Sequence, residues 1–467
     1  MLAKVFFMLL FAATSSFAIA QTDRPVSAYL TTADRTVVLT RQGNAQQWQS
    51  DATLSPTVLR VDDSKPLQKV QGFGFALTGG SAQLLHRMSP EARRSLLQEL
   101  FSRSGSGIGI STLRLTIGSS DLNDHVYTYD DMPRGVQDPE LTHFSLKEDE
   151  ADVIPVMQEI LQIVPTLRIM ASPWTAPSWM KTNGDSKGGS LQRRFYPAYA
   201  QYFVHYLKTM SAHGVPISAI TIQNEPLNTE NTPSMIMEAG EQTEFIRTAL
   251  GPALRAARLN TEVLIWDHNC DHPEYPLAVL KDSQAAQYVS GTAFHLYEGS
   301  AAAMSQIHDA HPEKSIEFAE QMVIENRDRS IRPVAEPVEN VVIAAMHNWS
   351  RTVLLWNLAA DPQFGPHTTN GGCPFCQGAV TIRGDHVHRN IAYYAIAQIS
   401  KFVPPGSVRV TSSDVHGLAN VAFRTPAGQI VLLVTNNSME ARTFVISWNT
   451  RAVIETLPRG SVATFTW

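Results

Sequence analysis

The sequence predicts an α/β fold, a (β/α)8 barrel (TIM barrel) joined to a small β-sandwich that both ends of the chain build. The chain has 467 residues, and a barrel of roughly 250 residues or more leaves room for a second unit. Through the middle of the chain, apolar β-type runs alternate with amphipathic helical stretches, which is typical of a parallel sheet covered by helices. Both ends contain strand-like segments without helices between them.

Eight short runs are candidate barrel strands, and several are apolar at successive positions, as expected for strands buried on both faces. They are Val70–Phe75, Thr112–Ile117, Leu167–Ala171, Ile217–Ile222, Val263–Trp266, Gly291–His295, Ile316–Ala319 and Val353–Trp356. Eight β/α units favour a closed barrel over an open doubly wound sheet, which usually has fewer strands.

Predicted helices lie between these runs. One begins at Ser89, a favourable N-cap that precedes Pro90 at the first helical position. The others are Lys147–Ile163, Ala198–Ala212, Thr243–Arg258 and Pro337–Asn348. The strand-like segments of the two ends are Val37–Leu39, Thr57–Val61, Leu418–Phe423, Ile430–Val434, Thr443–Trp448 and Val462–Trp467. We expect residues 21–66 and 401–467 to form the sandwich and residues 67–400 to form the barrel.

The first twenty residues have the features of a secretory signal peptide. Lys4 precedes a short apolar run, Val5–Ala13, and Ala18–Ala20 is a small-x-small cleavage site. The apolar run is too short to span a bilayer comfortably as an anchor. We therefore expect cleavage after Ala20 and a secreted or periplasmic protein without stable membrane insertion.

The composition is that of a soluble globular protein, with 43% apolar and 17% charged residues. A net charge of −6 does not indicate a nucleic-acid partner, which usually requires a basic excess. Three cysteines are too few for a disulfide scaffold. Cys373 and Cys376 form a C-x-x-C pair in a Gly- and Thr-rich loop. Only His367 lies close enough in sequence to help them bind zinc, so we expect a local disulfide there and a buried free thiol at Cys270. No feature indicates the oligomeric state.

Polar and aromatic residues cluster at the carboxyl ends of the predicted strands, where barrels of this kind place their sites. They are Arg114, Asp121, Trp174, Asn224, Glu225, Asp267, His268, His295, Tyr297, Glu320, Trp356 and Asn357. Glu225 and Glu320 follow the fourth and seventh strands, which lie on opposite sides of an eight-stranded barrel. A facing carboxyl pair is the machinery of glycoside hydrolysis. The alternative is a pair of ordinary surface carboxylates, but each ends an apolar strand beside aromatic or amide groups.

The pair predicts distinct roles for its two members. One must be a proton donor, whose neighbours must raise its pKa. The other must be a nucleophile that stays ionised, and Arg114 is a plausible cation for that purpose. Glu317 competes for this role, but it precedes Glu320 by three residues and is expected on the opposite strand face. Trp174, Trp179, Tyr297 and Trp356 suit stacking on sugar faces, with core packing as the alternative. Motifs for a serine nucleophile, a zinc helix, a P-loop or a dinucleotide site are missing or out of context.

At these residues the sequence resembles glycoside hydrolase family 30, the group that contains glucosylceramidase. The similarity runs from about Val70 to the C-terminus. Its motifs are Gln71-Gly72-Phe73-Gly74, Leu113-Arg114-Leu115 with Asp121, Ser172-Pro173-Trp174-Thr175, Gln223-Asn224-Glu225-Pro226, His295-Leu296-Tyr297, Phe318-Ala319-Glu320, Trp356-Asn357-Leu358 and Lys401-Phe402-Val403-Pro404. The resemblance implies a retaining β-glycosidase without metal or organic cofactor. It implies Glu225 as acid/base, Glu320 as nucleophile, Asn224 near the sugar 2-hydroxyl, and Arg114, Asp121, Trp174, Tyr297 and Trp356 along a glucose subsite.

Two departures leave the aglycone open between a glucan and glucosylceramide. Gly79 stands where many members carry Asp, and the loop from Asp361 to Gly378 is unlike that of animal glucosylceramidase. This loop looks more like that of members acting on β-1,6-glucan. Two alternatives remain, a xylan-cleaving relative of the same family and a carbohydrate-binding protein without catalysis. Endo and exo action are equally open, because both depend on loop shape.

Overall fold

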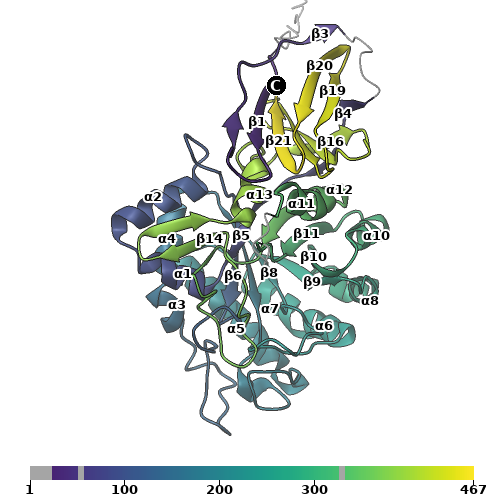
Figure 1. Cartoon of the computed structure of the whole chain (residues 1–467). Coiled ribbons are helices and arrows are strands. Elements are labelled where there is room, and N and C mark those ends of the chain that lie inside the picture. The colour runs from purple at the N-terminus through teal and green to yellow at the C-terminus, as the bar shows by residue number, and fades with distance from the viewer. Residues whose placement is uncertain (1–23, 51–56, 326–331) are drawn as a thin grey trace, which may run out of the picture.

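A computed structural model describes residues 24–50, 57–325 and 332–467. The predicted signal peptide lies outside these residues. All eight predicted barrel strands are present and close into a parallel barrel in sequence order (Figure 1). They are β5 (Gly72–Leu77), β6 (Thr112–Ile117), β7 (Arg168–Pro173), β8 (Ala219–Thr221), β9 (Glu262–Cys270), β10 (Gly291–Gly299), β11 (Ser315–Glu320) and β12 (Ser350–Leu355).

Helices surround this barrel, and most predicted ones are present with altered ends. The bounds are α1 (Gly79–His86), α2 (Pro90–Phe101), α3 (Lys147–Ala151), α4 (Val153–Ile163), α5 (Tyr196–Ala212), α6 (Ala239–Phe245), α7 (Gly251–Ala256), α8 (Glu274–Lys281), α9 (Ser283–Ala286), α10 (Ala302–Ala310), α11 (Ala335–Pro337), α12 (Ala344–His347) and α13 (Ile391–Ser400). Ser89 caps α2 as predicted, since its side chain accepts the N–H of Ala92.

Three helix predictions were wrong in detail. The expected helix Pro337–Asn348 is α11, a π-helical turn (Val338–Ile343) and α12 in succession. The expected helix Lys147–Ile163 is two helices, because Asp152 leaves helical geometry (φ −136°) and contacts His86 on α1 at 2.7 Å. The expected helix Thr243–Arg258 begins earlier, at Ala239, because Glu241 accepts the backbone N–H of Glu238 in a capping box. It then passes through a π-helical turn, Ile246–Leu250, and ends at Ala256.

The barrel interior is packed with small and medium apolar side chains. One buried apolar cluster inside the barrel comprises Met170, Ala219, Leu264, Ala293, Ala319 and Leu354. Below it, at the amino ends of the strands, Arg168 pairs with Glu317 and Glu262, each at 2.8 Å. The interior therefore has a polar floor at one end and the candidate site at the other.

The position of Glu317 differs from the one that its spacing from Glu320 predicted. Glu317 shares the inward face with Ala319 and accepts from Thr352 as well as Arg168. It does not lie on the opposite strand face from Glu320, because the register of β10 against β11 shifts and pairs His295 with Glu320. Depth separates the two glutamates: Glu317 lies at the amino end of the barrel and is held in an ion pair there.

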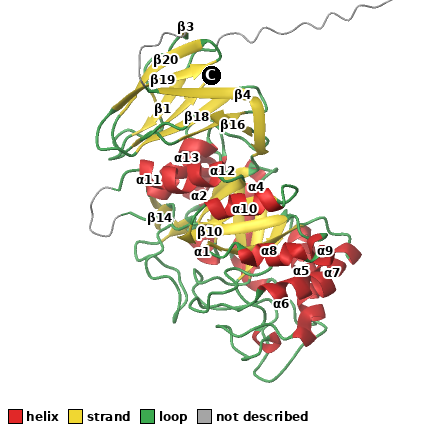
Figure 2. Cartoon of the chain, turned by 90° about the vertical axis from the view of Figure 1, so that its right-hand side faces the viewer, coloured by secondary structure: helices red, strands yellow, loops and turns green. Residues whose placement is uncertain are grey.

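The sandwich is one ten-stranded sheet folded over its own core (Figure 2). Strand order is β2 (Thr40–Arg41), β1 (Ser27–Thr31), β21 (Ser461–Thr466), β18 (Ile430–Asn436), β17 (Asn420–Arg424), β16 (Val408–Ser412), β4 (Val58–Lys69), β19 (Arg442–Trp448), β20 (Arg451–Leu457) and β3 (Gln49–Ser50). Both ends of the chain contribute, as expected, and β1 pairs with β21. The predicted strand Val37–Leu39 is a turn instead, because Thr32 bonds back to Val37 and Leu39 has a positive φ.

A small sheet follows the last barrel strand, and α13 after it connects the two units. The sheet consists of β13 (Ala359–Ala360), β14 (Val380–Arg383) and β15 (His386–Arg389), and it closes the loop that follows β12. On α13, Gln398 donates to Thr31 of β1 at 2.6 Å and receives the hydroxyl of Thr464 on β21. The sandwich is thus anchored to the barrel through both of its terminal strands. Among the described residues, no helix is both long and apolar enough to cross a bilayer.

Candidate active site

The carboxyl ends of the barrel strands surround a cavity of about 230 Å³. Its lining comprises Asp121, Trp174, Asn224, Glu225, Asn228, Asn231, Tyr297, Glu320, Met322, Trp356, Cys373, Phe375 and Cys376. The two predicted catalytic glutamates therefore meet in one cavity, with five more of the predicted residues. His295 contacts both glutamates without lining the cavity. Asn357 also lies outside the lining, since its carboxamide oxygen accepts from Thr78 and Ser81.

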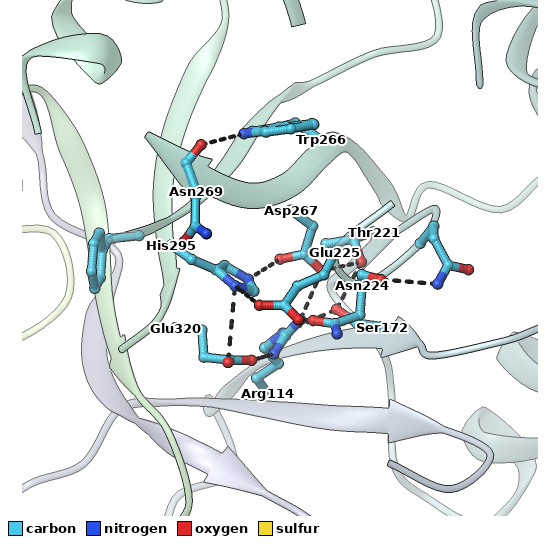
Figure 3. A network of polar contacts seen from close by, with 12 residues as sticks. Arg114, Ser172, Thr221, Asn224, Glu225, Trp266, Asp267, Asn269, His295 and Glu320 are labelled. Atoms are coloured by element: carbon cyan, nitrogen blue, oxygen red, sulfur yellow. Dashed lines mark hydrogen bonds and ion pairs between the residues drawn. The ribbon is translucent and has the colours of Figure 1, made fainter. Parts of the chain in front are cut away.

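Arg114 organises the base of this site (Figure 3). It is fully buried on β6, and its guanidinium donates to Glu320 at 2.5 Å, Asn224 at 2.7 Å and Asp267 at 2.8 Å. Its Nε donates to Ser172 at 3.0 Å. A guanidinium presents five donors in a fixed plane, so these bonds hold the ends of several strands in one geometry.

Glu320 ends β11 with a donor on each carboxylate oxygen. Arg114 donates to Oε2, and the hydroxyl of Tyr297 donates to Oε1 at 2.9 Å. Both bonds favour the ionised carboxylate and fix its rotamer. Arg114, the cation predicted to keep the candidate nucleophile ionised, is therefore in direct contact with Glu320.

Glu225 follows β8 in a left-handed backbone conformation, with φ +46°. Such a conformation is costly for a side-chain-bearing residue and concentrates at functional sites. The side chain accepts from Asn228 at 2.7 Å and Asn231 at 3.0 Å, both on its Oε2. These asparagines were missed by the sequence analysis, because the loop that contains them shows no periodic signal.

His295 and Asp267 connect the two glutamates. The ring Nε2 of His295 lies 3.0 Å from Asp267, and its Nδ1 lies 3.4 Å from Glu225 and 3.9 Å from Glu320. Thr221 contacts the other oxygen of Asp267 at 2.6 Å. Asp267 was noted in the sequence only as a residue at a strand end, yet it holds both Arg114 and His295.

The electrostatic interactions among His295, Asp267 and the two glutamates favour a protonated His295 ring. Burial lowers the pKa of His295, but the charge of Glu320 and the hydrogen bonds to Asp267 and Glu225 outweigh it and raise the pKa to about 9. For Asp267, burial is outweighed by Arg114 and His295, which hold its pKa well below the usual range. His295 is therefore an imidazolium between three carboxylates at neutral pH.

The pKa values of the two glutamates are shifted in opposite directions, and the prediction that the neighbours of Glu225 raise its pKa was wrong. Burial raises the pKa of Glu225, but the hydrogen bond and charge of His295 outweigh it and lower the pKa to about 2. Burial raises the pKa of Glu320 despite the opposing charges of His295 and Arg114. His295, whose raised pKa favours the protonated ring, lies 3.4 Å from Glu225.

Glu225, His295 and Glu320 each offer one potential metal-ligand atom, and these atoms lie within 4.8 Å of one another. A histidine that binds a metal ion must be neutral, with a lone pair available on one ring nitrogen. Both nitrogens of His295 face carboxylates, and their charge keeps the ring protonated. The trio therefore fits a shared proton better than a metal ion.

Two tryptophans form the apolar wall of the cavity. Trp174 and Trp356 stack with ring centroids 5.5 Å apart, and Arg114 lies 4.9 Å from the Trp174 centroid. Trp179 is not part of this wall. It packs against Phe195 and donates to Asp130, so the core-packing alternative is correct for this residue.

The cysteine pair also borders the cavity. Cys373 and Cys376 form a disulfide, as predicted, and Cys270 is a buried free thiol. Cys376 is buried against the tryptophan wall together with Ala76 and Leu122. The loop from Asp361 to Gly378 is therefore part of the site.

Asp121 should give the pH profile an alkaline limb. Burial and the charges of Glu320 and Glu225 raise the pKa of Asp121 to about 8, so the carboxyl is neutral below that pH and ionises above it. Ionisation would add a further negative charge beside both glutamates, so kcat/KM is expected to fall as pH rises through about 8. His295 loses its proton near pH 9 and should cause a second fall. In the D121N variant the first fall should vanish and the second remain; an unchanged profile would contradict this account.

Comparisons with known proteins agree with this geometry. The family model "Glycosyl hydrolase family 30 TIM-barrel domain" matches residues 70–403, and "Glycosyl hydrolase family 30 beta sandwich domain" matches residues 406–465. The chain is 34% identical over 405 residues to Endo-1,6-beta-D-glucanase neg1 of Aspergillus fumigatus, covering 81% of each protein. It is 31% identical over 450 residues to the lysosomal acid glucosylceramidase of Mus musculus, covering 90% of this chain and 85% of that one.

A solved endo-beta1,6-glucanase shares the whole architecture. It superposes with a TM-score of 0.87 at 33% identity and covers 95% of this chain and 99% of its own. Both units of the fold, the barrel and the sandwich, are therefore matched in sequence and in structure. The chain belongs to glycoside hydrolase family 30 and is a glycosidase of that family.

Proposed function

We propose that this glycosidase hydrolyses β-1,6-linked glucan with retention of configuration, with Glu225 as acid/base and Glu320 as nucleophile. The spacing of the two carboxyl groups carries the proposal. An oxygen of Glu225 and one of Glu320 lie within 4.8 Å of each other. Retaining glycosidases place their carboxyl groups about 5–5.5 Å apart, whereas inverting enzymes need about 6.5–9.5 Å to admit a water molecule.

In the first step, a carboxylate oxygen of Glu320 attacks the anomeric carbon while the bond to the leaving oxygen breaks. Glu225 gives its proton to that oxygen, and a glycosyl ester of Glu320 forms. Because the hydrogen bond and charge of His295 favour an ionised Glu225, we expect bound sugar to exclude water and to draw a proton from His295 onto Glu225. The bonds from Arg114 and Tyr297 fix the orientation of the Glu320 carboxylate, which limits the reorganisation needed before attack.

In the second step, Glu225 removes a proton from water, and the resulting hydroxide attacks the anomeric carbon. The ester bond to Glu320 breaks, and the sugar leaves with its original configuration. Neither step requires a metal or an organic cofactor. We expect Asn224, which accepts a hydrogen bond from Arg114 at 2.7 Å, to contact the sugar beside Glu320.

Glucan is favoured as substrate over a lipid glucoside. The glucanase relative is 34% identical and the glucosylceramidase relative 31%. The cavity rim near Glu225 presents the amides of Asn228 and Asn231, which suit further sugar hydroxyls. Glucosylceramide is the second candidate, since the similarity to its hydrolase extends over 90% of this chain.

The products should identify the substrate class. Purified protein is incubated separately with linear β-1,6-glucan and with glucosylceramide, and products are resolved over time. We expect a ladder of short β-1,6-linked oligomers from the glucan, which would also establish endo action. Release of glucose and ceramide alone would replace the glucan proposal with the lipid one. Activity on neither would direct attention to xylan or to a binding role without catalysis.

We further propose that the protein is exported. The support is the arrangement of Lys4, Val5–Ala13 and Ala18–Ala20. A disulfide at Cys373–Cys376 fits an oxidising compartment outside the cytosol. Sequencing the N-terminus of protein recovered outside the cytoplasm should find Gln21 as the first residue; an intact Met1 there would refute cleavage.

A further inference from the structure

Phe375 has an unusual position among the aromatic residues of this protein. Among the described residues, three large aromatic side chains are well exposed: Phe375 at 39%, Tyr297 at 38% and Phe364 at 36%. Phe375 and Tyr297 both border the active-site cavity, and Phe364 does not. An exposed aromatic ring beside a sugar-binding cavity offers an apolar face to a ring that lies outside the buried part of the site.

The backbone around Phe375 is held in place on both sides. The Cys373–Cys376 disulfide closes the turn that contains it, and Cys376 is buried against Trp174 and Trp356. Gly372 leaves no room for a side chain, because an added Cβ would lie 2.2 Å from the carbonyl oxygen of Thr368. An immobilised platform binds with less loss of conformational entropy than a free loop. The Phe375 ring is therefore exposed, while the backbone that carries it is held rigidly.

The same loop is bonded to the segment that carries the partners of Glu225. The hydroxyl of Thr368 donates to the carbonyl of Thr232 at 2.6 Å, and the hydroxyl of Thr232 donates to the carbonyl of Asn370. Asn231, which donates to Glu225, immediately precedes Thr232. Since the acid protonates the bridging oxygen, the leaving group must lie beside Glu225. The loop that carries Phe375 thus borders the leaving-group side of the cavity.

We propose that Phe375 is the stacking platform for the first sugar ring on the leaving-group side, and so a determinant of specificity for glucan. This inference rests on the proposed function and names the residue that would select its aglycone. The same cavity also presents the polar side chains of Asn228, Asn231 and Tyr297, which favour a sugar over an acyl chain as its occupant. The face of Phe375 packs against the ring, while these groups bind hydroxyls at its edge.

The test measures sugar transfer, which depends on the leaving-group side alone. β-Glucosyl fluoride forms the glycosyl-enzyme without needing an aglycone site, because fluoride is the leaving group. A β-1,6-linked glucose disaccharide then competes with water: its 6-hydroxyl attacks the anomeric carbon, Glu225 takes its proton, and the ester to Glu320 breaks. We expect F375A to lower the ratio of transfer to hydrolysis about tenfold, because the acceptor sugar loses the ring on which it stacks. F375Y should restore the ratio, because it keeps the ring.

F364A is the matched control, since Phe364 is equally exposed on the same loop but does not border the cavity. An unchanged ratio in F375A, or an equal loss in F364A, would overturn the inference. So would a loss of kcat/KM on glucosylceramide with sugar transfer intact, which would assign Phe375 to a lipid chain. Failure of the wild-type protein to consume any β-glucosyl substrate would instead refute the proposed function, and the two failures are thereby distinguishable.

Discussion

Replacing Glu320 with glutamine is expected to lower kcat on every β-glucoside at least about 10,000-fold. The amide cannot attack the anomeric carbon, and Arg114 loses the shorter of its two carboxylate contacts. Substrate binding should survive, because the tryptophan wall, Asn224 and Asp121 remain. The measurement is kcat and KM of the purified variant on an aryl β-glucoside and on β-1,6-glucan, together with its melting temperature.

E298Q serves as the control for this variant. Glu298 is an exposed residue of β10 directly after Tyr297 and does not line the cavity. It should retain full activity. A second readout uses E320A with azide, which can occupy the vacated space and attack an activated β-glucoside to give the α-azide. Turnover by E320Q within tenfold of the wild type would assign the nucleophile elsewhere.

The E225Q variant is expected to show the second large loss of activity, and the size of this loss should depend on the leaving group of the substrate. General acid catalysis contributes about 100- to 10,000-fold. Glucan, whose leaving alkoxide needs a proton, should lose activity by that factor. A glucoside with a good leaving group should still form the glycosyl-enzyme, which then accumulates because no base activates water. Pre-steady-state kinetics should therefore show a burst of leaving group followed by slow turnover.

The neighbouring residue Glu230 supplies the control, because its side chain is exposed on the same loop. E230Q should behave as the wild type on both substrates. Azide added to E225A should yield the β-azide, the opposite anomer to that from E320A, because it attacks the ester of an intact Glu320. Equal losses on glucan and on the activated glucoside would argue against Glu225 as the acid.

The sequence was sufficient to predict the barrel, because its strands are apolar on both faces and regularly separated by helices. Glu225 and Glu320 could be selected because closure of the barrel brings strand ends together. The role of Asp267 could not be predicted from the sequence. Its importance lies in contacts with Arg114 on β6, Thr221 on β8 and His295 on β10. No local pattern along the chain encodes a contact among four strands.

Local conformation explains the other differences. The left-handed backbone at Glu225, Asp267 and Asn357 turns side chains at strand ends in directions that strict alternation does not allow for. The register shift between β10 and β11 changed the expected place of Glu317 in the same way. Asn228 and Asn231 lie in an irregular loop. Their role becomes visible only once the loop has folded back over Glu225.

The pairing of β1 with β21 has a consequence for biogenesis. Ser27 aligns with Thr466, so during synthesis at about 5–20 residues per second the first strand waits roughly 20–90 s for its partner. The neighbours of β4, which are β16 and β19, are also made only after the last barrel strand. The barrel can close before either strand has a partner, and two unpaired β-segments then stay open to wrong association. A protein held unfolded until translocation ends would avoid this exposure, so cytoplasmic overproduction should favour aggregates that begin at the N-terminal strands.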